Sequence, residues 1–299
     1  MVGSAVAKLT ADYGIDVVGK SSKDLDLTDR TLVQSELQNI RPDVLLISAA
    51  RVGGIKENAT YPVDFLSINL RIQTNLLDAA HDAGVKRVLF LGSSCIYPKF
   101  APQPIKEEYL LSGPLESTNS AYAVAKIAGI KLVESYRQQF KHNWISIMPT
   151  NLYGPNDNFD SESAHVLPAL INKFHRAKEE NNTSITLWGD GSALREFLYV
   201  DDLAEAIIVL LTQYDENSPI NVGSGNEISI RDLAILISNV VGYKGKIEFG
   251  DGSLNGTPRK LLDSSKISNL GWTPKISLKQ GIEETYNWYL SRFTESRVN

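Results

Sequence analysis

The sequence of 299 residues holds only one cysteine, four histidines and two methionines. A single cysteine excludes an intramolecular disulfide, and such sparing use is typical of a reducing, cytosolic compartment. The histidines lack the Cys and His spacing of a structural zinc site. We therefore expect a cytoplasmic protein and predict no metal.

The chain also lacks a basic run and a long apolar run. Its 30 basic and 35 acidic residues are scattered and give a net charge of -5, which argues against a nucleic-acid or anionic-membrane surface. No apolar stretch approaches the roughly 18 to 20 residues of a membrane span, and the N-terminus has no signal pattern. We expect no nucleic-acid partner and no membrane, so a few local cations must hold any anionic ligand.

What the chain does have is 42% hydrophobic residues, enough for a large core. The first half alternates short β-branched runs with amphipathic stretches, which predicts βαβ units feeding a parallel sheet. The runs at 45–47 and 88–91 are apolar without alternation, as strands covered on both faces should be. The predicted strands are 15–18, 44–49, 87–91 and 144–148, and the predicted helices are 2–13, 28–40, 62–83 and 117–139.

After Pro149 the sequence changes to longer loops rich in Asn, Asp, Gly and Pro, with predicted helices at 164–178, 201–211, 230–241 and 278–291. These patterns predict a Rossmann-type, doubly wound α/β fold. We expect a nucleotide-binding domain over residues 1–150 and a smaller α/β substrate lobe over 151–299, with some chain returning to the first domain.

Gly3 is typical of the end of a glycine-rich phosphate loop that runs into a helix. The strand and the earlier glycines of such a fingerprint are absent, and we expect a clipped or misassigned start. One glycine near a helix start also fits a plain N-cap. The predicted strand at 15–18, at the usual distance, favours the phosphate loop.

The segment after that strand bears on which dinucleotide binds. Lys20 and Ser21 suit the 2′-phosphate of NADP better than the ribose hydroxyls of NAD, although they also fit an ordinary exposed turn. Asp26 can accept from the adenine amino group or cap the next helix. Ala49 and Ala50 would let backbone approach the cofactor, or form a tight βα turn.

Tyr122 and Lys126 are spaced to share one helix face. A nearby ammonium should lower the tyrosine pKa, which suits proton exchange with a sugar oxygen. The spacing alone is weak evidence. Support comes from Ser93 and Ser94 at the carboxyl end of an apolar strand, the edge where ligands of doubly wound sheets bind, although such serines are often turn formers.

The Ser/Tyr/Lys set, the truncated glycine loop and the segment 149–155 resemble an extended short-chain dehydrogenase/reductase acting on nucleotide sugars. Within that superfamily the chain is most similar to the GDP-L-fucose synthase family, from Met1 to about Tyr289. The resemblance implies NADPH-dependent epimerisation at C3 and C5 and reduction at C4 of GDP-4-keto-6-deoxy-D-mannose. Arg51 departs from the lysine that the family often has.

The resemblance also implies catalytic roles. Cys95 would be the base and His165 the acid of the epimerisation, and Tyr122 would protonate the ketone oxygen while Ser93 and Lys126 polarise it. Cys95 must then be partly thiolate, which needs positive charge from the cofactor or Lys126. Without the resemblance, Cys95 fits a small buried hydrophobe and His165 a surface or helix-start histidine.

Binding roles follow from the same resemblance. Asn151 and Leu152 would lie near the nucleotide sugar and, with Tyr122, Lys126 and His165, beside the cofactor. Trp188 also fits packing under a glycine turn, Lys173 a solvated helix face, and Arg259 either a phosphate or a structural role. The implied substrate-binding residues are Ser93, Ser94, Val166, Lys173, Trp188, Arg195 and Lys260.

Two classes of competing function remain open: a sister enzyme of the superfamily and a non-catalytic protein. A sister 4-epimerase would hold NAD and would not need the Cys95 and His165 pair, whereas a dehydratase usually has an Asp-Glu pair where Ser94 and Cys95 stand. A non-catalytic Rossmann protein commonly loses the tyrosine or lysine that this chain keeps. In the resembled family, the helices at 62–83 and 117–139 pair across a two-fold axis, so we expect a homodimer.

Overall fold

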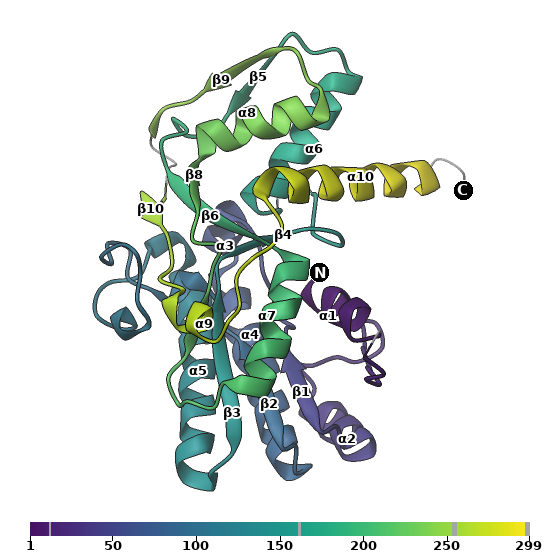
Figure 1. Cartoon of the computed structure of the whole chain (residues 1–299), viewed down its shortest axis with the longest axis vertical. Coiled ribbons are helices and arrows are strands. Elements are labelled where there is room, and N and C mark those ends of the chain that lie inside the picture. Colours follow the sequence, from purple (N-terminus) through teal and green to yellow (C-terminus); the bar gives the residue numbers. More distant parts are fainter. Residues whose placement is uncertain (12, 161–162, 253–255, 297–299) are drawn as a thin grey trace.

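The computed structural model describes residues 1–11, 13–160, 163–252 and 256–296, with side chains described as far as Arg292. The molecule has two parts along its long axis (Figure 1): helices surrounding a central sheet, and a smaller lobe above them. A mixed α/β fold built on a parallel sheet agrees with the predicted class. None of the described helices combines the length and the apolar character needed to cross a membrane.

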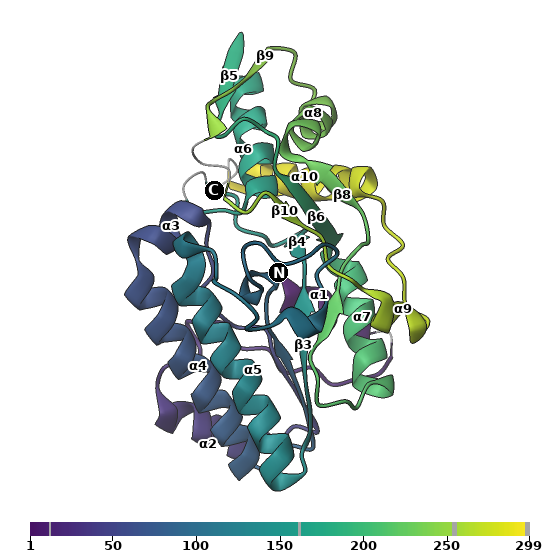
Figure 2. The same cartoon turned by 90° about the vertical axis from the view of Figure 1, so that its left-hand side faces the viewer.

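The larger part is built on a parallel sheet whose strands are ordered β1-β2-β3-β7. These strands span Val44–Ile47, Arg87–Leu91, Asn143–Pro149 and Ile220–Val222. On one face lie α2 (Arg30–Ile40), α4 (Pro62–Asp82) and α5 (Ser120–Phe140), with α4 and α5 side by side in Figure 2. On the other face lie α1 (Val2–Ala11) and α7 (Val200–Gln213).

Alternate residues of one strand serve two separate cores. Val88 and Phe90 of β2 pack with the helices of the first face, whereas Leu89 and Leu91 pack with those of the second. All four side chains are buried. A strand covered on both faces has no solvent side, which explains why its sequence shows no alternation.

The smaller lobe has its own core around Phe174, Leu233 and Tyr153. Its main sheet is ordered β10-β6-β4, with β8 antiparallel to β6, and β5 pairs separately with β9. The strands are β4 (Asn151–Tyr153), β5 (Ser184–Leu187), β6 (Leu194–Tyr199), β8 (Glu227–Ser229), β9 (Lys246–Phe249) and β10 (Arg259–Lys260). The helices are α6 (Val166–Glu179), α8 (Ile230–Val241) and α10 (Leu278–Ser296). Two short helices belong to the larger part: α3 (Ile55–Thr60) lies between β1 and α4, and α9 (Ser265–Asn269) follows β10 and contacts β7.

Most predicted elements are present with small shifts at their ends. The predicted helix 117–139 begins as a 3-10 turn, Ser117–Asn119, before α5. The predicted helix 2–13 ends at Ala11, and residue 12 lies outside the described residues.

The predicted strand at 15–18 is wrong. Residues 15–20 pair with no strand of the described chain, and Ile15, Val17 and Val18 are 51%, 43% and 56% exposed. β1 makes its strand pairing with β2. An apolar run becomes a strand only beside a partner that accepts its backbone hydrogen bonds, and here the run lies away from the sheet.

Candidate active site

The carboxyl end of β2 places a serine against a tyrosine from α5. Gly92 follows the strand, and a Cβ there would lie 2.5 Å from Met148 Sδ, so the chain needs glycine to pass. Ser93 then caps a single 3-10 turn, Ser94–Ile96, and its Oγ accepts from the Cys95 amide at 3.2 Å. The Ser93 side chain lies close enough to Tyr122 to oppose the rise of the tyrosine pKa. The structure thus brings the predicted serine and tyrosine together.

Lys126 lies one helical turn after Tyr122 and is only 3% exposed. Its Nζ donates to the Leu91 carbonyl at 2.7 Å and lies 5.9 Å from the Tyr122 ring centroid. Burial lowers the pKa of Lys126 to about 8. The ammonium is therefore fixed at the end of β2, within reach of the tyrosine face.

The expectation that Lys126 lowers the tyrosine pKa is not met. Burial raises the pKa of Tyr122, the charge of Cys95 adds to that rise, and the Ser93 side chain only partly opposes it. Loss of hydration disfavours the phenolate, and the lysine is committed to a backbone carbonyl. Tyr122 accordingly holds its proton as a donor.

Cys95 has a different cation beside it from the one expected. The Nζ of Lys260, on β10, lies 3.5 Å from Cys95 Sγ, at hydrogen-bonding distance for sulfur. His165 precedes α6 with an exposed side chain. Its pKa is lowered by partial loss of hydration and by the positive charge of Lys260. The Lys260 ammonium therefore contacts the thiol and exerts its charge on the imidazole, which links the two predicted proton-transfer residues electrostatically.

Arg195 joins this group of cations. It pairs in register with Lys260 across β6 and β10, and its Nη1 donates to the Leu194 carbonyl at 2.8 Å. Burial lowers its pKa, an effect that the charge of Cys95 opposes. Arg259 forms an ion pair with Glu227 at 2.7 Å, which favours the structural one of its two roles.

Comparison with known proteins shows the family of this chain. A family model described as the NAD dependent epimerase/dehydratase family matches residues 1–223. The chain belongs to this family. A relative named putative GDP-L-fucose synthase 2, from Arabidopsis thaliana, is 53% identical over 99% of the chain and 91% of its own length.

Two further members of the family extend the agreement. GDP-L-fucose synthase from Escherichia coli is 47% identical over 97% of the chain and 94% of its own length. The solved GDP-L-fucose synthetase from Naegleria fowleri bound to NADP is 30% identical, with a TM-score of 0.89, over 98% of this chain and 92% of that one. The resemblance drawn from the sequence is confirmed.

The remaining predicted binding residues differ in their contacts and in their exposure to solvent. Asn151 Nδ2 donates to the Glu196 carbonyl at 2.7 Å, and Lys173 Nζ donates to the Thr186 carbonyl, so both are held by the lobe. Trp188 is 65% exposed, which is the opposite of packing under a turn. The others differ in exposure: Val166 is exposed, Leu152 is half-buried and Ser94 is buried.

The sequence did not single out Glu196 as a residue that shapes the site. It is fully buried, and its carboxylate accepts from the amides of Gly225 at 2.7 Å and Leu262 at 3.0 Å. Burial raises its pKa, and these hydrogen bonds oppose the rise. Glu196 thereby ties the segment after Lys260 to the strand of Arg195. The sequence signal for this buried carboxylate was a charged residue directly before the apolar run 197–200.

Two buried atoms near the site have no hydrogen-bond partner among the described protein atoms. Asn119 Oδ1 is one, three residues before Tyr122, and Asp157 Oδ2 is the other. Burial raises the pKa of Asp157 to about 6. Sequence reasoning missed both. The i, i+3 spacing of Asn119 and Tyr122 was an available signal for the first; no spacing pattern indicated Asp157.

The residues at the carboxyl end of β1 fit a dinucleotide. A Cβ on Gly3, in the first turn of α1, would meet Ser48 Oγ at 3.6 Å, so the helix start lies beside that strand end. The first turn of α1 carries no acidic residue. Ala49 and Ala50 follow as exposed and half-buried small residues. Unblocked backbone amides at a helix start are what a pyrophosphate needs.

The residues predicted to bind the adenosine end have local partners instead. Lys20 pairs with Glu36 at 3.0 Å. Ser21 Oγ donates to Asp24 at 2.6 Å, and Asp26 accepts from the amide and hydroxyl of Thr28. These local hydrogen bonds and the ion pair favour the alternative of an exposed turn. The N-cap of α2 is Asp29 rather than Asp26.

Proposed function

We propose that this protein is a GDP-L-fucose synthase, converting GDP-4-keto-6-deoxy-D-mannose to GDP-L-fucose by epimerisation at C3 and C5 and reduction at C4. Relatives at 47% and 53% identity over nearly the whole chain carry that name. The observation that carries the assignment is the position of Lys260, in contact with Cys95 and electrostatically coupled to His165. A simple ketone reductase has no use for such a pair.

Epimerisation uses the acidity of the protons that flank a ketone. Removing the proton at C3 or C5 leaves an enolate, and inversion requires a new proton on the opposite face. Cys95 takes the proton as base and His165 returns one as acid. Lys260 stabilises the anionic sulfur, and the same charge makes the imidazolium of His165 a stronger acid because it lowers the pKa.

Reduction uses the other group of residues. NADPH supplies a hydride to C4 when bound. Tyr122 gives its proton to O4, and its raised pKa keeps that proton in place until the oxygen becomes basic. Ser93, which lies near Tyr122, donates to the same oxygen. Enolate formation and ketone reduction both place negative charge on O4, so one set of donors serves both stages.

The cations of the lobe suit a GDP-sugar. Arg195 and Lys260 lie side by side across β6 and β10, and an arginine can bind two oxygens of a diphosphate while a lysine supplies a point charge. The exposed indole of Trp188 offers a flat apolar surface to the sugar or the diphosphate region. NADP is the proposed cofactor, in line with the NADP that the Naegleria fowleri protein binds.

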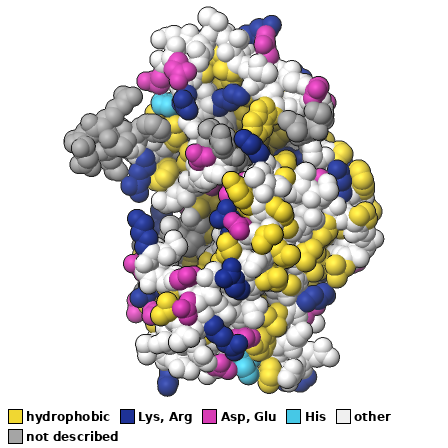
Figure 3. Space-filling view, turned by 180° about the vertical axis from the view of Figure 1, so that it is seen from behind, with side chains coloured by type: hydrophobic (Ala, Val, Ile, Leu, Met, Phe, Trp, Pro, Cys, Tyr) yellow, Lys and Arg dark blue, Asp and Glu magenta, His cyan; other side chains and the backbone are white. Residues whose placement is uncertain are grey.

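A homodimer is also proposed. Hydrophobic side chains gather on the face seen from behind, over the side that α4 and α5 occupy (Figure 3). Val63 of α4 and Val124 of α5 are 73% and 46% exposed. An apolar face on paired helices favours a two-fold contact with a second copy. The cytosolic setting rests on cysteine usage and stays a prediction.

The test is a reaction in deuterated water with the keto sugar and either NADPH or NADH. The proposal predicts deuterium at C3 and C5 of the product, together with oxidation of NADPH. Oxidation without deuterium uptake would leave only a ketone reductase. Replacing Cys95 with serine should abolish the uptake and preserve NADPH binding, whereas an equal loss of both would assign Cys95 to packing.

A further inference from the structure

The loop before the proposed acid is held by a turn from the other part of the molecule. The Gly54 amide, between β1 and α3, donates to the Ser163 carbonyl at 2.9 Å. A Cβ on Gly54 would lie 2.9 Å from the Ala164 carbonyl oxygen. His165 is the next residue. The turn thus contacts the two residues that directly precede His165 and position its backbone.

Gly54 is needed for close approach rather than for an unusual backbone. Its φ is -68° and its ψ is 176°, values that alanine adopts without strain. An alanine here would fit its own backbone and still push against Ala164, since contacts below 3.0 Å force one side to move. The substitution therefore tests the contact alone.

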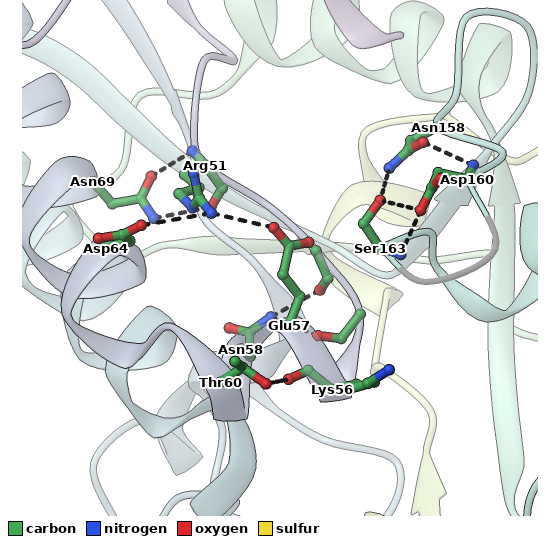
Figure 4. A network of polar contacts seen from close by, with 12 residues as sticks. Arg51, Lys56, Glu57, Asn58, Thr60, Asp64, Asn69, Asn158, Asp160 and Ser163 are labelled. Carbon is green, nitrogen blue, oxygen red and sulfur yellow. Dashed lines mark hydrogen bonds and ion pairs between the residues drawn. The ribbon is translucent and has the colours of Figure 1, made fainter.

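The turn is rigid because two buried asparagines hold it. Asn58 Nδ2 donates to the carbonyls of Gly53 at 2.8 Å and Gly54 at 3.0 Å. Asn69 accepts from the Arg51 amide at 2.8 Å and donates to the Arg51 carbonyl at 3.0 Å. The two asparagines are 6% and 2% exposed. Figure 4 shows Asn69 beside Arg51, and Asn58 further along, near Glu57 and Thr60.

Ser163 makes further hydrogen bonds to residues that precede it in the chain. Asn158 Nδ2 donates to Ser163 Oγ at 2.8 Å, and the Ser163 amide donates to Asp160 at 3.1 Å (Figure 4). His165 stands at the N-cap of α6, but its side chain makes no capping hydrogen bond. No capping hydrogen bond therefore holds the imidazole at the helix start, and the contact of residues 163–164 with Gly54 bears on where the backbone of His165 lies.

We propose that Gly54 and Asn58 are positioning residues for His165, required for inversion and not for proton removal. This inference rests on the proposed function. Cys95 sits on the turn after β2, a separate element, so moving the loop at 163–165 leaves the base in place. A shift of about 1 Å in a reacting group can cost roughly 100-fold in rate.

The experiment compares Gly54→Ala and Asn58→Asp with wild type in deuterated water, using the keto sugar and NADP⁺ so that no reduction follows. Asn58→Asp keeps the shape but sets a carboxylate oxygen against two carbonyls. Cys95 still removes a proton, and without the acid its solvent-exchanged deuteron returns to the same face. We expect the rate of deuterium exchange to stay within about twofold of wild type, with the deuterium found in recovered, uninverted sugar. The rate of inversion should fall at least tenfold.

Gly250→Ala is the matched control, because a Cβ there meets its nearest atom, the Leu187 carbonyl oxygen, at an ordinary 3.5 Å. It should keep both rates. An unchanged ratio of inversion to exchange in Gly54→Ala and Asn58→Asp would overturn the inference, as would equal loss of both rates in folded variants. A wild type that neither exchanges deuterium nor oxidises NADPH would instead overturn the proposed function.

Discussion

The residues around the ketone and those predicted to meet the adenosine end are held in different ways. Lys126, 3% exposed, bonds to a strand 35 residues away, and Lys260 reaches Cys95 across 165 residues of sequence. Ser21 and Asp26 bond to residues two or three positions away, in a segment whose Val18 is 56% exposed. Long-range contacts fix geometry, whereas local ones only shape a turn.

This difference has a physical origin in the sheet. β2 is covered on both faces and paired on both sides, so residues that follow it inherit a fixed position. The segment 15–20 has no strand partner in the described chain. We therefore expect substitutions at the reacting end to have large effects and substitutions at the adenosine end to have small ones.

Tyr122→Phe should have the largest effect. The ring keeps its edge contact with Phe65, at 6.4 Å between centroids, but the proton donor is lost. Donation by a positioned side chain contributes about 100- to 10,000-fold, so NADPH oxidation with the keto sugar should fall by at least 100-fold. Tyr13→Phe, in the exposed segment, is the matched control and should not differ from wild type. A loss below tenfold in Tyr122→Phe would assign the donor role elsewhere.

The pH dependence should report Lys126. Because its pKa is lowered to about 8, the side chain is charged below that pH and neutral above it. If the ammonium is needed, kcat/KM falls about tenfold per pH unit on the basic side of roughly pH 8. Lys126→Arg keeps its charge at these pH values, so this basic limb should disappear from its pH profile. If kcat/KM of the wild type instead rises through pH 8, the charged form of Lys126 is not the active one.

Lys260→Met should slow the alkylation of Cys95. Iodoacetamide reacts with the thiolate, and the chain has a single cysteine, so total labelling reports that one site. Removing a cation 3.5 Å from the sulfur should reduce the labelling rate at neutral pH roughly five- to tenfold, by the strength of a partly screened charge pair. Lys260→Arg should retain most of the rate, and Lys20→Met should retain all of it. Equal rates in wild type and Lys260→Met would show that the thiol does not depend on this charge.

The same contrast separates what the sequence could reveal from what it could not. The apolar run of β2 and the i, i+4 pair on α5 are local patterns: the strand lies at its predicted bounds, and Tyr122 and Lys126 lie on one face of α5, although the predicted effect of the lysine on the tyrosine pKa is not met. The strand at 15–18 failed because membership of a sheet depends on a partner that periodicity does not report. The contact of Lys260 with Cys95 and the hydrogen bonds of Glu196 join distant segments, so no spacing rule could supply them.

Lys20→Ala should have the smallest effect, and it tests whether the adenosine end takes part at all. Lys20 already pairs with Glu36 at 3.0 Å, with both side chains partly exposed. Exposed ion pairs contribute about 0.2 to 1 kcal/mol, so we expect KM for NADPH to rise about two- to fivefold while KM for NADH stays constant. Glu36→Gln should lower KM for NADPH, because it releases the lysine to a 2′-phosphate. If both variants change the two KM values in parallel, Lys20 belongs only to the turn, and selectivity for the phosphate must lie elsewhere.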